Sequence, residues 1–405
     1  MNIFIIGGGI VGLNTALELQ GRGHSVTVYE HDTGGTVAAS YGNAGHIATE
    51  QVEPLASPAA IRSAWSRLFM RGGALSLPPA AISTWLPFSL RLMRAAKPDS
   101  FVRGKAALSQ LIHEALPAWR RRLSNIAAAD LLREDGHFVV WEAPATAAAG
   151  LRAWREADTG TARLREADAD ELAALKGLTT APIAGAVRFE GTGQIVDPRR
   201  LLDTLAARFT ERGGHVVHEA VTALRVEGGR VVVGGTSADA VVVCAGVWSK
   251  PLMERLGFRV PMIAERGYHL QSTVPVWPQG MPPVVFEDRS MIVTRFESGV
   301  RAASFVEFNR TDAPPDARKW QRLEGHVRDL GLPFGDPAKA ARWMGARPTL
   351  PDYLPAIGQV DGLPVYYAFG HQHLGLTLAA LTAEHVGAMV DGGMPPAEFD
   401  LSRFQ

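Results

Sequence analysis

A glycine pattern near the start of the chain restricts the fold more than any other feature. Residues 7–12 read G-x-G-x-x-G, between an apolar run at 2–6 and a stretch at 10–20 with apolar residues at helical spacing. A β-branched run follows at 25–30, so the chain begins with a predicted strand–helix–strand unit. The first glycine permits a tight turn, the second lets the backbone approach a pyrophosphate, and the third allows close helix–strand packing. The pattern therefore predicts a Rossmann-type dinucleotide-binding domain.

The surroundings of the pattern favour the same function. The free N–H groups and positive dipole end of the predicted helix suit a pyrophosphate. Glu30 ends the second strand, where an acidic side chain accepts hydrogen bonds from an adenosine ribose and repels a 2′-phosphate. NADP is therefore disfavoured, but the pattern does not decide between NAD and FAD.

Composition excludes several other classes. At 405 residues the chain is too long for one ordinary core, which suggests two domains. Lys plus Arg and Asp plus Glu each number 41, so charge does not support a nucleic-acid partner. Cys244 is the single cysteine, which rules out a disulfide framework and suits a reducing compartment. H-E-x-x-H, C-x-x-C and G-x-S-x-G are absent, and we predict no metal site.

The chain shows no secretory or membrane-spanning pattern. Its first residues run directly into a strand pattern without a basic leader. The longest charge-free stretch, residues 72–90, contains three prolines and two glycines, which do not suit a spanning helix. Residues 85–94 mix aromatic, apolar and arginine side chains, and fit either a packed helix or one that rests on a membrane surface. We expect a cytoplasmic protein, either free or peripheral on the inner face of the membrane.

Four segments beyond Glu30 resemble the D-amino-acid oxidase superfamily of flavoproteins. They are A-A-S-Y-G-N-A-G at 38–45, V-C-A-G-V-W-S at 243–249, G-A-R-P-T-L-P-D-Y-L-P-A-I-G at 345–358, and G-H-Q-H-L-G-L-T at 370–377. They occur in the family's order and cover most of the chain. The resemblance implies FAD as the cofactor.

Smaller segments resemble one branch of this superfamily. The Y-G-N-A-G loop and residues 301–308 look most like bacterial D-amino-acid dehydrogenases, and residues 45–51 resemble the D-hydroxyproline branch. Members with covalent flavin carry His in a W-H-x-x-G loop or Cys near the C-terminus. Here Gly42 takes the first position of that loop, and the cysteine lies in the A-x-G turn. The resemblance therefore implies non-covalent FAD.

The expected fold class is α/β plus α+β. We expect a discontinuous Rossmann-type FAD domain from residues 1–45, 190–258 and 340–405. A substrate domain of mixed sheet and helices would take residues 46–189 and 259–339, with the active site at the interface. The alanine-rich, charged residues within it at 150–177 predict a helix.

The resemblance also implies candidate catalytic residues. Arg347 falls on the family's carboxylate-binding position in G-x-R-P, and a planar guanidinium pairs with both carboxylate oxygens; the alternative is a structural arginine. Tyr268, on a predicted strand, would donate its hydroxyl to the same carboxylate, or be a half-buried strand tyrosine. His46, Glu50 and His371 would line the pocket and orient the amine or a ring hydroxyl, although His371 also suits a purely loop-shaping role.

The cofactor contacts come from the glycine pattern and the resemblance together. The helix after Leu374 should direct its N-terminus at the flavin and stabilise negative charge on the reduced ring. The expected contacts are Gly7, Gly9, Ile10, Val11, Gly12, Glu30, Ser40, Asn43, Ala44, Gly45, Val221, Ala245, Gly246, Trp248, Gly370, His373, Leu374, Gly375, Leu376 and Thr377.

The resulting hypothesis is FAD-dependent dehydrogenation of a D-amino or cyclic imino acid, such as D-proline or 4-hydroxy-D-proline. Hydride would pass from the α-carbon to flavin N5 while the protein aligns the substrate. The electron acceptor, a quinone or another carrier, is open. One alternative is a glycine- or sarcosine-type oxidase that uses oxygen. Others are a tRNA-modifying flavoenzyme, which the neutral charge disfavours, and a non-catalytic FAD-binding subunit of a dehydrogenase complex.

Overall fold

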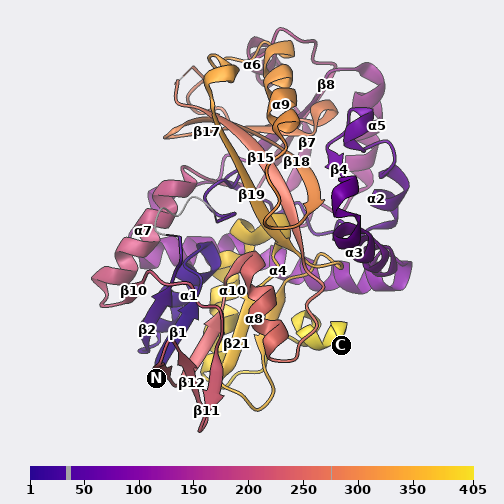
Figure 1. Ribbon diagram of the computed structural model, residues 1–405. Coiled ribbons are helices and arrows are strands. Elements are labelled where there is room, and N and C mark those ends of the chain that lie inside the picture. Colours follow the sequence, from indigo (N-terminus) through magenta and orange to yellow (C-terminus); the bar gives the residue numbers. More distant parts are fainter. Residues whose placement is uncertain (33–37, 275) are drawn as a thin grey trace.

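The computed structural model describes residues 1–32, 38–274 and 276–405. It has two lobes, each built around a sheet, and both chain termini lie on the same lobe (Figure 1). The sheet of that lobe has six strands in the order β10-β2-β1-β14-β21-β20. These strands are β1 (Asn2–Ile6), β2 (Ser25–Tyr29), β10 (His215–Val217), β14 (Ala240–Val243), β20 (Ala356–Gln359) and β21 (Val365–Phe369).

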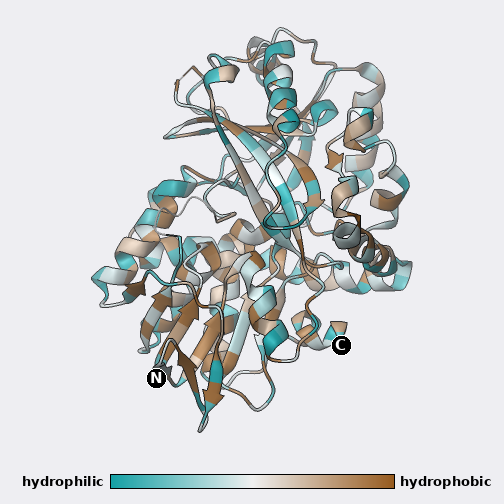
Figure 2. Ribbon diagram, viewed as in Figure 1, coloured by the Kyte–Doolittle hydropathy of each residue, from teal (hydrophilic) through white to brown (hydrophobic). Residues whose placement is uncertain are grey.

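The six-stranded sheet is parallel except for β20, which pairs antiparallel with β21. Its central strands β1 and β14 are almost wholly apolar and buried, as expected where both faces of a parallel sheet are covered. Figure 2 shows hydrophobic residues concentrated in these strands, whereas the α9 helix (Ala317–Asp329) of the other lobe is mostly hydrophilic.

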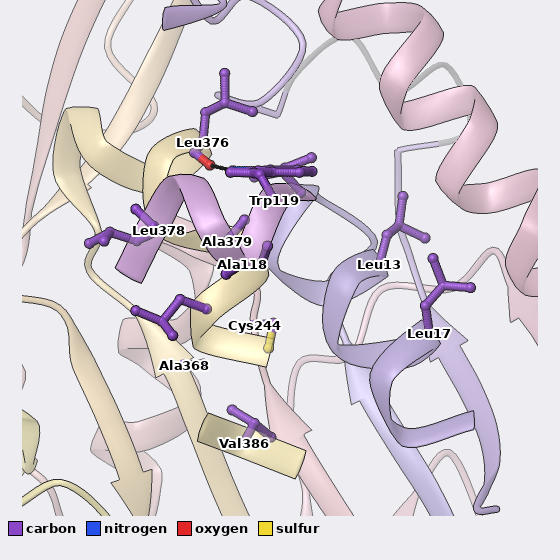
Figure 3. Packing of buried hydrophobic residues seen from close by; sticks show 14 of the residues in the cluster. Leu13, Leu17, Ala118, Trp119, Cys244, Ala368, Leu376, Leu378, Ala379 and Val386 are labelled. Carbon is purple, nitrogen blue, oxygen red and sulfur yellow. Dashed lines mark hydrogen bonds between the residues drawn. The ribbon is translucent and has the colours of Figure 1, made fainter. Parts of the chain in front are cut away.

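Three helices form the core beside this sheet. They are α1 (Ile10–Gly21), α10 (Gly375–Val390) and α4 (Pro98–Asn125). Trp119 of α4 is fully buried, and its indole N–H donates to the Leu376 carbonyl at 2.9 Å (Figure 3). α7 (Pro198–Glu211) also packs against α1 and begins at Asp197, whose carboxylate accepts the backbone N–H groups of the first helical turn.

The second lobe contains a mixed sheet in the order β19-β15-β18-β17-β16-β6-β8-β7, with β4 beside β18. Its strands are β4 (Leu75–Ser76), β6 (His137–Trp141), β7 (Arg163–Glu166), β8 (Gly185–Glu190), β15 (Ile263–Ser272), β16 (Val284–Phe286), β17 (Met291–Phe296), β18 (Gly299–Asn309) and β19 (Ala341–Thr349). The α9 helix packs against β15 and β18. The expected combination of a Rossmann-type sheet and a mixed sheet is confirmed.

Smaller elements complete the structure. One three-stranded sheet contains β3 (His46–Ile47), β9 (Gly193–Ile195) and β5 (Leu132–Arg133). Another contains β11 (Arg225–Glu227), β12 (Arg230–Val233) and β13 (Thr236–Ala238). The remaining α-helices are α2 (Pro58–Ser63), α3 (Ile82–Ala95), α5 (Pro144–Glu156), α6 (Ala169–Gly177) and α8 (Ser249–Arg255). No helix in the part of the chain that the structure describes is long and apolar enough to cross a membrane.

The predicted helix over 150–177 is confirmed at its two ends, in α5 and α6, and wrong in the middle, where β7 interrupts it. α5 ends at Glu156, Gly160 has a left-handed φ of 59°, and β7 pairs antiparallel with β8 before α6 begins. Arg165 on β7 bonds to Glu190 at 2.7 Å, and this side-chain pairing across strands accompanies the ladder. Helical propensity is a weak preference that strand pairing overrode.

Two elements lie across the predicted domain boundaries. β19 follows the boundary at residue 340, yet it pairs along its length with β15 in the mixed sheet. α4 lies within 46–189, yet its buried face belongs to the core beside the six-stranded sheet. The division of the chain into an FAD domain and a substrate domain stays a proposal.

Candidate active site

A cavity of about 930 Å³ lies where the two lobes meet. Its wall on one side comes from the turn after β1, the loop before β3, the turn after β14 and the first turn of α10. The opposite wall comes from β15, β18 and β19 of the mixed sheet, with β6 at one end. The site therefore draws on segments from the whole length of the chain.

The glycine turn after β1 leaves no room for side chains. Gly7 has a φ of 106°, and a Cβ there would lie 2.6 Å from the Cys244 carbonyl oxygen. A Cβ on Gly12 would lie 1.8 Å from the Gly7 carbonyl oxygen. Gly9, Ile10 and Val11 at the start of α1 line the cavity. The Ile10 N–H donates to Ser40 Oγ at 3.1 Å, and the positive end of the helix dipole suits an anionic group. The turn fits the pyrophosphate of FAD.

Glu30 lies at the same end of the cavity. Its carboxylate accepts the Gly8 N–H at 2.6 Å and the Asp32 N–H at 2.9 Å. Val221 and Trp248 line the cavity here as well. An acid held by backbone donors beside a glycine turn suits the adenosine ribose, so this end fits the ADP half of the cofactor.

The predicted cofactor contacts fall into two groups. Most line the cavity: Gly7, Gly9, Ile10, Val11, Glu30, Ser40, Asn43, Ala44, Val221, Ala245, Gly246, Trp248, His373, Gly375 and Leu376. The others, which lie behind its surface, are Gly12, Gly45, Gly370, Leu374 and Thr377. Thr377 shows what such a residue does, because its hydroxyl accepts the Ala48 N–H at 3.1 Å and ties α10 to the loop after β3.

Arg347 on β19 faces the cavity opposite a buried acid. Its register partner on β15 is Glu265, and Nη1 lies 3.1 Å from Glu265 Oε1 and 3.3 Å from the Phe305 carbonyl oxygen. Glu265 is 1% exposed and also accepts hydrogen bonds from Thr349 and Tyr353 at 3.1 and 2.9 Å. The guanidinium is thus held in place from behind, while its side chain stays 28% exposed toward a ligand.

A missing side chain makes room for this guanidinium. A Cβ on Gly267 would lie 2.4 Å from Arg347 Nη2, so a side chain there would displace the guanidinium from this position. A planar guanidinium fixed by a carboxylate can still bind a second carboxylate through its free N–H groups. The geometry suits a substrate carboxylate anchor.

Tyr268 lies nearby, but its hydroxyl is engaged in a buried network. It donates to Glu307 at 3.1 Å and accepts from Arg266 Nη2 and the Asp316 N–H, both at 3.2 Å. Burial raises the pKa of Tyr268 to about 12. The single hydroxyl hydrogen of Tyr268 is therefore used in the hydrogen bond to Glu307, although the tyrosine lines the cavity. This arrangement favours the interpretation as a structural strand tyrosine.

His46 and Glu50 lie together at the β6 end of the cavity. His46 Nε2 is 3.0 Å from Glu50 Oε1, and the His46 ring meets the ring of His137 edge-on at 4.5 Å. Burial raises the pKa of Glu50, but His46, His137 and a backbone hydrogen bond together lower it to about 2. Burial lowers the pKa of His137 to about 3. The cluster thus presents the anionic carboxylate of Glu50 near the neutral imidazole of His137.

His371 and His373 flank the start of α10. His371 Nε2 is 3.0 Å from Thr382 Oγ1, and His373 Nε2 is 2.5 Å from Gln51 Oε1. Burial lowers the pKa of His371 to about 3 and that of His373 to about 4, so both are neutral. Their side-chain partners hold the loop that positions the N-terminus of α10 at the cavity, where Gly375 lies in the wall.

Three wall residues were not anticipated from the sequence. Glu265 is an acid within a buried strand, which is a usable signal because buried charges need partners. His137 begins the apolar strand β6, and nothing in that sequence distinguishes it from the other buried residues of the strand. Arg67 lines the cavity from an irregular segment that carries no pattern.

Comparison with known proteins places this site in a family. A family model described as FAD dependent oxidoreductase matches residues 2–389. A D-amino-acid oxidase from Bradyrhizobium diazoefficiens is 31% identical, with 100% of this chain and 99% of that protein covered. A D-amino acid dehydrogenase from Cereibacter sphaeroides is 30% identical, over 98% of this chain and 93% of that protein.

Solved structures share the fold at low identity. L-proline dehydrogenase from P. horikoshii has a TM-score of 0.71 at 17% identity and covers 100% of this chain and 97% of its own. Glycine oxidase from Geobacillus kaustophilus has a TM-score of 0.69 at 21% identity, with the same coverage of both chains. Together with the glycine turn and the shared cavity, the match over residues 2–389 shows that this chain belongs to the family of FAD-dependent oxidoreductases.

Proposed function

We propose that the protein dehydrogenates a D-amino acid or a cyclic imino acid, with 4-hydroxy-D-proline and D-proline as the first candidates. The observation that carries this is Arg347, a fixed but accessible guanidinium in the same cavity as the glycine turn. D-amino acids are named in the relatives that match the whole chain. The cyclic substrates rest on the resemblance of residues 45–51 to the hydroxyproline branch.

The chain's own residues would bind and orient. FAD, when bound, supplies the acceptor for the α-hydrogen as hydride, at N5 of its flavin ring. Arg347 would hold the substrate carboxylate, and the first turn of α10, with N–H groups at the cavity, would favour negative charge near it. His46 and Glu50, at the β6 end, would meet the polar groups of the substrate. Alignment of the α-carbon is then the main contribution of the protein.

Anaerobic reduction of the flavin tests this proposal. The holoenzyme is mixed with single amino acids without oxygen, and the bleaching of the visible flavin band is timed. Fastest bleaching by 4-hydroxy-D-proline or D-proline supports a cyclic substrate. Fastest bleaching by D-alanine supports D-amino-acid dehydrogenation but makes an acyclic D-amino acid the substrate. Bleaching by glycine or sarcosine alone, with peroxide formed in air, favours the oxidase alternative. If no amino acid bleaches the flavin band, the catalytic proposal fails, and a tRNA-modifying or non-catalytic role is favoured instead.

A second proposal concerns membrane contact. The α3 helix exposes Ile82, Leu86, Leu90 and Met93, which are 51, 42, 51 and 45% exposed and lie three or four residues apart on one face. Trp65 and Met70, from the segment before it, are also exposed. An apolar helical face with arginines on its flanks is typical of a helix that lies on a lipid surface. Such contact would suit electron transfer to a quinone.

Vesicle sedimentation tests this contact. The protein should sediment with vesicles of phosphatidylglycerol at low salt, and the Leu86→Gln/Leu90→Gln variant should stay in solution. Met394→Gln serves as the control, because Met394 is 93% exposed but follows α10 in the other lobe. The proposal would be refuted if all three proteins sedimented equally, or if the wild type did not sediment with the vesicles.

A further inference from the structure

Three side chains at the β6 end of the cavity have the composition of a metal site. His46 on β3, Glu50 in the following turn and His137 on β6 each offer one ligand atom, and these atoms lie within 4.8 Å of one another. Two ligands on one zinc ion lie about 3.3 Å apart, since Zn–N and Zn–O bonds are about 2.0–2.2 Å long. Small side-chain rotations therefore bring all three atoms onto one ion.

Two of these groups have buried atoms without a partner. Glu50 is 5% exposed, and its Oε2 has no hydrogen-bond partner among the described residues; the same holds for His46 Nδ1. A buried carboxylate oxygen without a donor is costly, because it loses its hydration and gains nothing in return. All three residues contribute to the lining of the cavity.

We propose that His46, Glu50 and His137 form a binding site for a divalent transition-metal ion of the zinc class, with an open coordination position toward the cavity. Two imidazoles and one carboxylate are the ligand set of zinc sites that keep a fourth position for water or substrate. In this cavity the fourth position would take a carboxylate or hydroxyl oxygen of the bound molecule. The zinc measurement does not depend on the identity of the substrate, because ion binding requires no turnover.

The third ligand is oriented from behind. His137 Nδ1 is 3.1 Å from Thr192 Oγ1, so Nε2 is the nitrogen that would bind the ion. The imidazole also stacks on the Phe189 ring at 4.6 Å and 3°. A hydrogen bond to the far nitrogen fixes ring orientation and tautomer in metal sites. This support distinguishes His137 from a histidine that merely fills the core.

Zinc binding by the holoenzyme tests the proposal. The FAD-loaded protein is treated with a chelator and dialysed to equilibrium against ZnCl₂, and bound zinc is counted by elemental mass spectrometry. We expect about one Zn²⁺ per chain, and a loss of affinity of at least about 100-fold in Glu50→Gln and His137→Phe, each of which lacks one ligand. Thr192→Val keeps all ligands and should lose roughly 10–100-fold.

Control variants keep the test decisive. His326→Gln removes a histidine of α9 outside the cavity and should bind zinc like the wild type. FAD content and the thermal midpoint of each variant report its folding. If a ligand variant does not fold, the zinc affinity of Thr192→Val decides the test. Absence of zinc from the wild type at 100-fold excess would overturn the proposal. Equal affinity of wild type, Glu50→Gln and Thr192→Val would do the same.

Discussion

The two walls of the cavity are built on opposite principles. The wall around the glycine turn is shaped by missing side chains, so that backbone N–H groups reach the surface of the cavity. The wall from β15, β18 and β19 is shaped by buried charges. Next to Tyr268 of this wall, Arg266, Glu307 and Lys319 of α9 are 0, 1 and 0% exposed. Arg266 Nη1 lies 3.4 Å from Glu307 Oε1, and Lys319 Nζ is also bonded to that carboxylate.

The difference predicts how each wall fails. The turn fails when a side chain is added at Gly7 or Gly12, because a Cβ there would meet backbone atoms that cannot move aside. A wall of paired charges fails when one partner is removed, because the other stays buried without compensation. The first wall therefore tolerates no gain of volume, and the second tolerates no loss of charge.

The largest expected effect is on the first wall. Gly12→Val should abolish FAD retention, since even a Cβ would lie 1.8 Å from the Gly7 carbonyl oxygen. Gly21→Ala at the end of the same helix has nothing within 4 Å of the added Cβ and should keep its FAD. Flavin absorbance per chain after gel filtration measures both. Full FAD content in Gly12→Val would refute this account of the turn.

The next effect is on catalysis. Arg347→Met should lower kcat/KM for the amino acid substrate by roughly 30- to several thousand-fold, because a buried charge pair to the carboxylate is worth about 2–5 kcal/mol. Arg342→Met on the same strand removes an arginine that pairs with Glu324 and should stay within about twofold of the wild type. If Arg347→Met does not fold, Arg347→Met/Glu265→Gln removes the uncompensated acid. An unchanged kcat/KM would leave Arg347 a structural arginine.

Tyr268→Phe separates structure from binding on the second wall. Loss of the hydroxyl leaves Glu307 with one donor fewer, so the free energy of unfolding should fall by about 1–3 kcal/mol. KM should change by less than about twofold, since the proton of Tyr268 goes to Glu307. Urea unfolding and steady-state kinetics measure the two quantities. A raised KM with unchanged stability would instead make Tyr268 a carboxylate contact.

The buried histidines predict a pH dependence of stability. The pKa of His371 is about 3 in the folded protein, through burial, and about 6.5 when unfolded. Between these values the unfolded chain binds more protons, so stability falls as pH drops below about 6.5. His371→Gln should lose about 1.5 kcal/mol less than the wild type between pH 6.5 and 5, by urea unfolding. Parallel losses in both proteins would contradict this.

The smallest effect concerns the attachment of FAD. Cys244 is 6% exposed behind the glycine turn, and burial raises the pKa of its thiol to about 12, which keeps it unreactive. Acid precipitation should release the flavin of wild type and Cys244→Ala alike. Flavin retained in the wild-type pellet and released from the variant would show a covalent bond.

Much of the first wall was predictable because its information is local. The strand β1, the helix α1 and the strand β2 lie within thirty residues, and glycines at fixed spacing mark the turn. Arg347 is a candidate through a resemblance that spans most of the chain, and its role stays a prediction. The predicted helix at 150–177 is wrong only in its middle, because pairing with β8 decided β7.

The sequence alone therefore determined the dinucleotide turn, the class of cofactor and the candidate anchor, since short spacings or recognisable segments encode each of them. Only the tertiary structure decided that Glu265 would hold Arg347, that Glu307 would accept the hydrogen bond of the Tyr268 hydroxyl, and that His137 would lie beside His46 and Glu50. These contacts join strands far apart in the chain. They depend on sheet order and register, which no local pattern specifies.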